Sequence, residues 1–307
     1  MSISTNRQTV ITTSSMPAGI PYKRTMVLKL KQITSPPPRN CVGFFNTTKG
    51  GSGVELNKIY NEDCLEGMKR IPDGSVDMIL CDLPYGTTKN KWDTIIPFEP
   101  LWEQYERIIK DNGAIVLTAS QPFTTKLIES NFGLFRYELI WDKTFGRQPQ
   151  LANIQPMKRH ENILVFAKRG YGKITYNPQK EPLEKPYHSK GASNNSGSRN
   201  GHGLGLKKVA KTYTHKTPTT ILGFKPPSNS VTVHSTQKPV ELMEYLIKTY
   251  TNEGETVLDN CMGSGTTAIA SMRTGRNYIG FELDEEYYKA AQQRIKDENT
   301  HLESQSR

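Results

Sequence analysis

The sequence lacks the features typical of membrane-spanning proteins, of secreted proteins and of zinc-binding proteins. No apolar run in its 307 residues approaches the roughly 18 needed for a membrane-spanning helix, and no secretory signal follows the N-terminus. The four cysteines, Cys41, Cys64, Cys81 and Cys261, are scattered and form no Cys-x-x-Cys pair. This spacing argues against a zinc site and a disulfide framework, and it favours a reducing compartment.

Acidic residues are missing from one end of the chain and scarce in one internal segment. Residues 1–54 carry seven Lys or Arg and no Asp or Glu, and residues 168–216 carry eleven Lys or Arg and two acids. The net charge of the whole chain is +10, so these two segments supply +16 and the rest sums to −6. An acidic body with two basic attachments suits an enzyme that binds a polyanion such as nucleic acid. Two solvated basic segments without a partner are the alternative that charge alone leaves open.

Composition divides the chain into five stretches. Residues 1–54 are rich in Ser, Thr and Pro and predict a mostly disordered tail, with an organelle transit peptide as the less favoured interpretation. Residues 55–168 and 234–298 alternate strand patterns with helical patterns, whereas residues 169–233 are rich in Gly, Ser, Asn, Lys and Pro and follow no period. A short tail is expected at residues 299–307.

The two patterned stretches predict an α/β fold with a mostly parallel sheet, helices on both of its faces and an irregular basic insert. Helices are expected at 98–110, 122–131, from 239 onward, 265–274 and 284–296. Strands are expected at 76–82, 114–118, 137–141, 163–166, 256–259 and 277–282.

The first motif is Asp82-Leu83-Pro84-Tyr85, which directly follows a predicted buried strand. Open parallel sheets place their sites at this carboxyl end of the strands. A carboxylate and a main-chain carbonyl in a turn fixed by proline can accept two hydrogen bonds from one exocyclic amine, and the tyrosine can stack on the ring that carries it. An ordinary proline-containing turn with a packed tyrosine is the alternative that these four residues alone leave open.

In the second motif, another predicted strand ends in an acid, and a predicted helix begins after a glycine-containing turn. Asp259 is followed by Gly263 and Gly265, and Glu282 ends the next predicted strand. Glycines let the backbone approach a ligand, helix amides point at it, and a second acid can hold two ribose hydroxyls. The third glycine of a dinucleotide fingerprint is absent, which argues against NAD. A tight strand-to-helix turn without a ligand is the alternative.

The third motif, His-Ser-Thr-Gln-Lys-Pro at residues 234–239, stands before a predicted helix. Proline favours the first helical turn, and the polar residues before it could meet a ligand carboxylate. Taken alone, the segment indicates a plain helix start.

Together, these motifs resemble those of the DNA methyltransferases that methylate amino groups with S-adenosylmethionine. The amine motif precedes the cofactor motif, which resembles the permuted order called the β class, over about residues 54–296 apart from 169–233. The family pattern is usually Asp-Pro-Pro-Tyr for adenine N6 and Ser-Pro-Pro-Tyr for cytosine N4. Asp82 therefore favours adenine, while Leu83 departs from the pattern but keeps the main-chain carbonyl, and Ser235 replaces a commoner proline. No Pro-Cys motif supports methylation at cytosine C5.

The resemblance implies a Rossmann-like methyltransferase fold, S-adenosylmethionine as the cofactor and no metal. The catalytic residues that it implies are Asp82, Leu83, Pro84 and Tyr85. Residues 61–64 resemble the family's loop at the cofactor adenine, with Asp63 as the contact. The cofactor-binding residues that it implies are Asp63, Cys64, Thr236, Lys238, Asp259, Gly263, Gly265, Thr266 and Glu282.

The implied partner is double-stranded DNA, and no membrane partner is expected. By resemblance, residues 169–233 lie where the family places target recognition, and Lys207, Lys208 and Lys211 are expected to neutralise phosphates. The target base has to leave the stack to be methylated, with Tyr85 replacing the lost stacking. We expect a cytoplasmic enzyme of a bacterial or phage restriction-modification system, with a homodimer as one option for its assembly.

Three other functions stay open at this point. They are cytosine-N4 methylation of DNA, methylation of RNA or of a protein glutamine amide, and nucleic-acid binding by a catalytically inactive relative. The basic insert favours DNA over a protein substrate. The intact Asp82, Tyr85, Gly263 and Gly265 favour an active enzyme.

Overall fold

The computed structural model describes residues 53–86, 93–147, 149–168, 173–190, 210–228 and 237–305. Some residues with sequence-based expectations lie outside these ranges. They are the N-terminal tail up to residue 52, Lys207, Lys208 and Thr236. Within them, no helix has the length and apolar character needed to cross a membrane.

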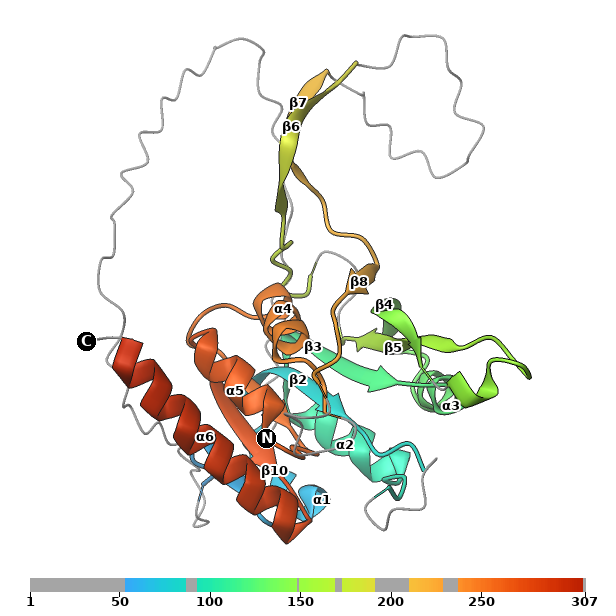
Figure 1. Cartoon of the computed structure of the whole chain (residues 1–307). Helices are drawn as coiled ribbons and strands as arrows, with labels where there is room; N and C mark the ends of the chain where they lie inside the picture. Colours follow the sequence, from blue (N-terminus) through green and yellow to red (C-terminus); the bar gives the residue numbers. More distant parts are fainter. Residues whose placement is uncertain are drawn as a thin grey trace, which may run out of the picture. The chain divides into compact units, whose positions relative to one another are not determined.

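The helices and strands alternate along the body of the chain, as expected (Figure 1). The helices are α1 (Cys64–Met68), α2 (Phe98–Ile108), α3 (Phe123–Ser130), α4 (Val240–Tyr250), α5 (Thr266–Arg273) and α6 (Glu285–Gln305), with a short 3₁₀ turn at Pro149–Leu151. The strands are β1 (Lys58–Tyr60), β2 (Val76–Asp82), β3 (Ile109–Ala119), β4 (Phe135–Arg147), β5 (Lys158–Phe166), β6 (Glu181–Ser189), β7 (Lys211–Lys216), β8 (Ile221–Gly223), β9 (Thr256–Asp259) and β10 (Asn277–Phe281).

The described residues form one eight-stranded sheet in the order β1-β10-β9-β2-β3-β5-β4-β8. Strands β1, β10, β9, β2 and β3 pair in parallel, and β8 pairs in parallel with β4. Strand β5 is antiparallel to both of its neighbours, β3 and β4. The sheet is therefore mostly parallel, as the alternation of strands and helices predicts.

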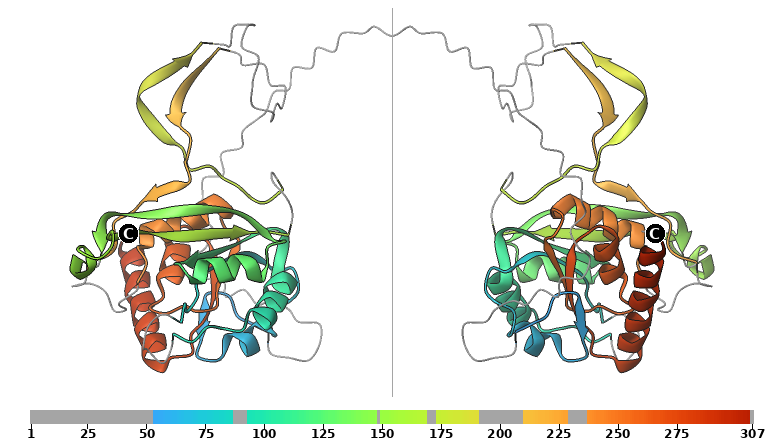
Figure 2. Two further views of the ribbon diagram at one scale, coloured as in Figure 1. Left: turned by 90° about the vertical axis from the view of Figure 1, so that its right-hand side faces the viewer. Right: turned by 90° about the vertical axis from the view of Figure 1, so that its left-hand side faces the viewer.

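Helices cover both faces of this sheet because successive side chains of a buried strand point in opposite directions. In β2, Ile79 and Cys81 join the core formed with α1, α2 and α3, while Met78 and Leu80 join the core formed with α4. Helix α6 packs on β1 and α5 in a third, smaller cluster. Figure 2 shows the orange and red helices α4–α6 on one side of the strands and the blue to green helices α1–α3 on the other.

The chain leaves β2 and β9 in opposite directions, although these strands are neighbours in the sheet. From β2 it continues to β3 on one side, and from β9 it continues to β10 on the other. Met78 and Ile79 pair with Val257 and Leu258, so Asp82 and Asp259 end adjacent strands. Such a reversal leaves a crevice at the carboxyl ends of the strands, which is where ligands of open α/β sheets bind.

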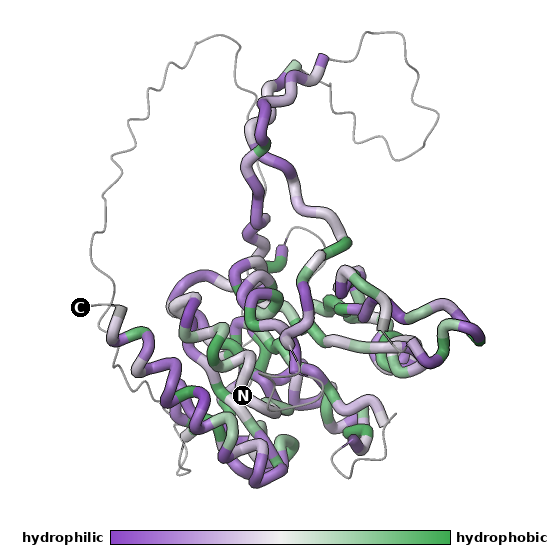
Figure 3. Tube along the Cα trace, in the orientation of Figure 1, coloured by the Kyte–Doolittle hydropathy of each residue, from purple (hydrophilic) through white to green (hydrophobic). Residues whose placement is uncertain are grey.

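The insert is more regular than its composition predicts. Strands β6 and β7 form a separate antiparallel pair whose residues are mostly exposed, and Figure 3 shows that hydrophilic residues dominate it. Strand β8 belongs to the main sheet instead, where Leu222 is buried beside Trp141 of β4. Only part of the stretch 169–233 is therefore separate from the body.

The boundaries of both predicted tails differ from those in the structure. Val54 is 0% exposed and packs in the core, so the body begins within the range assigned to the N-terminal tail. Helix α6 continues to Gln305 through residues from 299 onward, expected to be a tail, and Glu298, just before them, pairs with Arg273 of α5 at 2.7 Å. Strand β1 and helix α1 are elements that the apolar patterns did not predict, because both are very short.

Candidate active site

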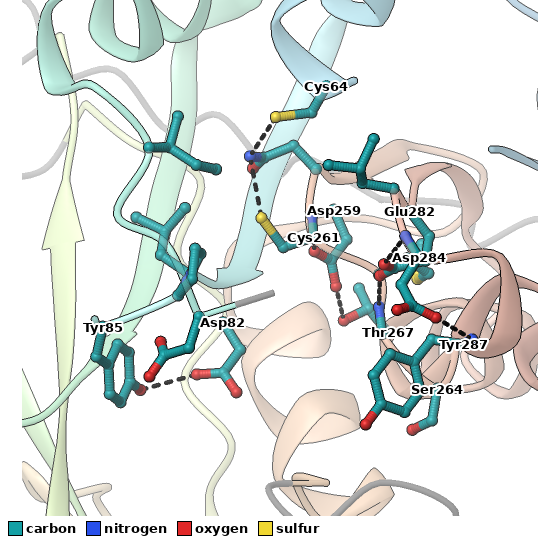
Figure 4. Close-up of a pocket in the computed structure, with 18 of the residues that line it drawn as sticks. Cys64, Asp82, Tyr85, Asp259, Cys261, Ser264, Thr267, Glu282, Asp284 and Tyr287 are labelled. Atoms are coloured by element: carbon teal, nitrogen blue, oxygen red, sulfur yellow. Dashed lines mark hydrogen bonds between the residues drawn. The ribbon is translucent and has the colours of Figure 1, made fainter. Parts of the chain in front are cut away.

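A cavity of about 610 Å³ occupies the crevice between β2 and β9. Its lining comes from the ends of β2, β9 and β10, the start of α1 and the segment before α4. Figure 4 shows Asp82 and Tyr85 at one end and Glu282, Asp284 and Tyr287 at the other. One pocket therefore joins the amine motif to the glycine motif.

Asp82 is held by donors from three different elements. The Tyr85 hydroxyl donates to its Oδ1 at 2.8 Å, and the Thr118 hydroxyl of β3 donates to the same oxygen. Lys238 Nζ donates to Oδ2 at 2.5 Å. These bonds fix the orientation of the carboxylate while leaving its side chain 25% exposed toward the pocket.

The ring of Tyr85 packs against the ring of Phe123 of α3. The ring centroids are 5.1 Å apart and the planes meet at 26°, so the two rings are stacked. Lys238 Nζ lies 5.9 Å from the centroid of the Tyr85 ring. Burial, together with the negative charges of Asp82 and Glu161, raises the pKa of Tyr85 well above its usual value, so the hydroxyl stays a proton donor.

Lys238 is 5% exposed and lies between two carboxylates. Besides Asp82, it faces Glu161 Oε2 of β5 at 3.4 Å, and Glu161 also pairs with Lys143 of β4. Burial alone would raise the pKa of Glu161, but the charges of Lys238 and Lys143 outweigh it and bring the pKa to about 2. Burial would likewise lower the pKa of Lys238, but Asp82 and Glu161 raise it instead.

The two glycines of the loop after β9 have different surroundings. Gly263 has φ +53° and lines the cavity, and a Cβ atom there would meet the Cys261 carbonyl oxygen at an ordinary contact distance of 4.0 Å. Gly265 has φ +81° and begins α5, and a Cβ there would lie 3.1 Å from Ala291 Cβ of α6. Gly263 therefore faces the pocket, whereas Gly265 allows the loop to approach α6 closely.

Asp259 is buried and accepts hydrogen bonds from the loop that follows it. Its Oδ1 accepts from the Cys261 amide at 3.0 Å, and its Oδ2 accepts from the Thr267 hydroxyl at 2.6 Å. Burial raises the pKa of Asp259 to about 6 despite these donors. The side chain thus shapes the loop as well as lining the cavity.

Glu282 accepts two backbone hydrogen bonds in the same manner. Gly263 N–H donates to Oε2 at 2.6 Å, and Asp284 N–H donates to Oε1 at 2.9 Å. Burial raises the pKa of Glu282. The carboxylate is fixed at the cavity wall, where the motif predicts it.

The start of α1 closes the pocket beside Asp259. Asp63 caps this helix, and its Oδ1 accepts from the Leu65 and Glu66 amides at 2.8 and 3.2 Å. Cys64 accepts from Asn260 Nδ2 at 3.5 Å, and the Tyr105 hydroxyl donates to Asn260 Oδ1 at 2.5 Å. Cys64 and Cys261, far apart in the sequence, both bond this one buried amide.

Comparison with known proteins identifies the family. A family model described as N6_N4_Mtase: DNA methylase matches residues 76–293. The chain belongs to this family. It is 28% identical over 251 residues to the Type II methyltransferase M1.MboII of Moraxella bovis, covering 78% of this chain and 96% of that protein. It is 29% identical over 259 residues to the Type II methyltransferase M.BglII of Bacillus subtilis, covering 78% and 68%.

Solved structures of methyltransferases share the fold. The M1.HpyAVI–SAM complex is 24% identical with a TM-score of 0.52, covering 77% of this chain and 98% of that one. The PvuII DNA methyltransferase, described as cytosine-N4-specific, is 15% identical with a TM-score of 0.55, covering 78% and 86%. The predicted Rossmann-like methyltransferase fold is confirmed.

Most sequence-predicted site residues of this DNA methylase line the one cavity. Gly265 and Lys211 do not line the cavity, because Gly265 faces α6 and Lys211 lies on β7. Thr236 lies outside the described residues. Those that line the cavity are Asp63, Cys64, Asp82, Leu83, Pro84, Tyr85, Lys238, Asp259, Gly263, Thr266 and Glu282.

Three functional positions escaped the sequence patterns. Thr118 and Glu161 belong to strands in which apolar residues dominate the sequence pattern. Asn260 follows Asp259 and belongs to no recognised motif position. For Glu161 a signal was available, since a charged residue precedes the apolar run Ile163–Phe166. A buried acid at that position needs cations beside it.

Proposed function

We propose that this DNA methylase transfers a methyl group from S-adenosylmethionine to the N6 amine of adenine in double-stranded DNA. The observation that carries the proposal is the single cavity in which Asp82 and Tyr85 face the loop of Gly263 and the carboxylate of Glu282. An amine and a methyl donor bound in one cavity would lie side by side.

The cavity fits S-adenosylmethionine in size and in chemistry. Its volume of about 610 Å³ lies within the range of small-molecule sites, roughly 300–1,000 Å³. Glu282 can accept ribose hydroxyls, and Gly263, which has no side chain, allows a ligand to approach the backbone closely. S-adenosylmethionine is the cofactor of this pocket, and it supplies an electrophilic methyl group when bound.

The chain's own residues position the amine. Asp82 accepts one N–H, and the Leu83 carbonyl in the turn fixed by Pro84 accepts the other. These bonds favour an sp³-like nitrogen whose lone pair points at the methyl group, and such positioning supplies much of the acceleration. Tyr85 stacks on the flipped base and at the same time donates to Asp82.

Asp82 at the head of the amine motif favours adenine, and cytosine N4 is the second candidate. Both amines are exocyclic and planar, so the same pair of acceptors would serve either. The family to which the chain belongs, N6_N4_Mtase, covers both amines, which supports keeping this candidate.

We assign DNA contacts to the insert, and specifically to β6 and β7. Tyr187 and Tyr213 pair across these strands with ring centroids 6.3 Å apart, and both are exposed. Lys211 Nζ lies 5.5 Å from the Tyr213 centroid. Exposed aromatic rings with cations suit nucleic acid, and an antiparallel pair of strands fits the DNA major groove.

Expression in a bacterial host that lacks DNA methylation tests the function. Single-molecule sequencing of the host DNA reports the modified base and its sequence context together. We expect N6-methyladenine at one short sequence, in the bacterial cytoplasm where the DNA lies. N4-methylcytosine at one sequence would establish the second candidate. An unmodified genome from cells containing folded protein would reject both.

A further inference from the structure

Glu161 lies next to the amine motif but belongs to no predicted motif. It comes from β5, the strand antiparallel to its neighbours, and lines the cavity with a side chain 14% exposed. Its Oε2 accepts no hydrogen bond from the described residues and faces Lys238 Nζ at 3.4 Å. A buried carboxylate oxygen in this state is retained at a cost, so its role needs an explanation.

Glu161 belongs to a cluster of charged side chains that also includes Lys158, whose charge interacts with Glu161, Lys143 and Lys238. Its ion pairs join two anions, Asp82 of β2 and Glu161 of β5, to two cations, Lys143 of β4 and Lys238 from the segment before α4. Lys238 is the shared member, because it contacts both anions. Its ammonium group is almost fully buried, and a flexible lysine stem held at two points has less freedom than one held at one point.

We propose that Glu161 is a positioning residue, which holds Lys238 against Asp82 and so fixes the carboxylate that accepts the target amine. The proposal rests on the proposed function. With Glu161 present, Lys238 is fixed between two carboxylates and Asp82 keeps one orientation. Without its charge, Lys238 has a single anchor, and Asp82 Oδ2 follows the movement of the lysine.

The test compares Glu161→Gln with Glu138→Gln in single-turnover methyl transfer from labelled S-adenosylmethionine to unmethylated genomic DNA. Glu138 is the matched control, since it is an exposed acid of β4 that accepts from Asn162 at 3.0 Å and does not line the cavity. We expect Glu161→Gln to lower the transfer rate by about 10- to 100-fold, as misplacement of a catalytic group does. Glu138→Gln should match the wild type.

Two further readouts separate positioning from loss of structure. The affinity and stoichiometry of S-adenosylhomocysteine, measured by calorimetry, should be those of the wild type in Glu161→Gln. In a Lys238→Met background, Glu161→Gln should have no further effect on the transfer rate, because Glu161 acts through Lys238. Multiplying effects in the double variant would show independent action and overturn the proposal.

A second variant keeps the inference testable if Glu161→Gln does not fold. Lys143→Met removes the other cation of Glu161, and we expect a smaller decrease that also disappears in the Lys238→Met background. Full activity of Glu161→Gln, with the wild type active, would overturn this inference alone. A wild-type protein that transfers no methyl group to any DNA would overturn the proposed function and this inference with it.

Discussion

The two sides of the cavity stabilise their acids in different ways. On the side of the amine motif, Asp82 and Glu161 are paired with lysine side chains from distant parts of the chain. On the side of the glycine motif, Asp259 and Glu282 are bonded by backbone amides of the loops after β9 and β10 and by the Thr267 hydroxyl of α5. One side therefore depends on charged lysine partners, and the other depends on neutral amide and hydroxyl donors.

The difference appears in the direction of the pKa shifts. Lysine charges outweigh burial at Glu161 and lower its pKa to about 2, whereas burial outweighs neutral donors at Asp259 and raises its pKa to about 6. A full charge can compensate a buried carboxylate, and dipoles of amides and hydroxyls compensate it less. Changes on the two sides should therefore affect different steps, namely transfer on one and cofactor binding on the other.

The largest effect is expected at Asp82. Asp82→Ala removes the acceptor of the target amine, and we expect transfer to fall by about 10²–10³-fold, as when one preorganised group is removed from an active site. Affinity for S-adenosylhomocysteine should change little, because the cofactor contacts lie on the other side. Single-turnover rates and calorimetry measure the two quantities. Equal losses in both would remove the distinction between the two sides.

The second effect concerns stability against pH at Asp259. Its pKa is about 6 in the folded protein against an ordinary 3.8, so the folded state binds the proton more tightly than the unfolded state. Wild type should therefore gain stability relative to Asp259→Asn as the pH falls from 7 to 4, by up to about 3 kcal/mol. Urea unfolding of both proteins at several pH values measures this difference.

Glu161 provides the opposite case for the same measurement. Its pKa of about 2, against an ordinary 4.5, adds stability above pH 4.5 that is lost as the pH falls through this range toward 2. Wild type should lose stability relative to Glu161→Gln over that interval. If both differences moved in one direction with pH, the contrast between the two sides would be wrong.

The third effect is a loss of cofactor affinity in Glu282→Gln. The change weakens the acceptor for Gly263 N–H and for the ribose hydroxyls, and hydrogen bonds to charged groups contribute about 1.5–3 kcal/mol, so we expect roughly 10- to 100-fold weaker binding of S-adenosylhomocysteine. Glu285→Gln is the control, because this exposed acid pairs with Lys289 at the start of α6 and does not line the cavity. Unchanged calorimetric affinity in Glu282→Gln would reject the cofactor assignment.

The fourth effect separates the two contacts of Tyr85. Tyr85→Phe loses the hydrogen bond to Asp82 but keeps the ring that packs on Phe123, so part of the transfer rate should survive. Tyr85→Ala also loses stacking on the base, which contributes roughly 1–3 kcal/mol. Single-turnover rates should rank wild type above Phe and Phe above Ala. Equal rates for the two variants would contradict the stacking role.

Much of this site could be predicted from the sequence because it lies in short continuous motifs. Asp82 and Asp259 each end a buried strand, and parallel strands bring their carboxyl ends to one edge. The sequence does not predict that β2 and β9 are neighbours, because local patterns carry no information on the order of strands in the sheet. The roles of Thr118 and Glu161 depend on it too, because β3 and β5 bring these side chains to Asp82 and Lys238.

Two predicted element boundaries differ from those in the structure. Residues 111–113, Asp-Asn-Gly, separate the expected helix at 98–110 from the expected strand at 114–118, yet they lie within β3, where the pairing with β2 shifts register between Val76 and Met78. The last turns of α6 carry few apolar residues, but Glu298, beyond the predicted end at residue 296, is buried and pairs with Arg273 of α5, and this contact supports the longer helix. In both places tertiary packing outweighs local propensity.

The smallest effect is expected outside the cavity, at Lys211 of β7. Its side chain is exposed and lies against Tyr213, in a pair of strands with no buried core of its own. A lysine that neutralises a phosphate contributes to binding without reading sequence, so Lys211→Ala should weaken binding equally on the methylated sequence and on a scrambled one.

Binding titrations at several salt concentrations measure this effect. The slope of log affinity against log salt should decrease by about one for the lost contact. Lys289→Ala is the matched control, because this exposed lysine lies on α6 and pairs with Glu285 at 2.6 Å. A slope that stays constant in Lys211→Ala would show that β7 does not contact phosphate. A loss confined to the methylated sequence would mean that Lys211 reads a base, which would move target recognition onto β7 itself.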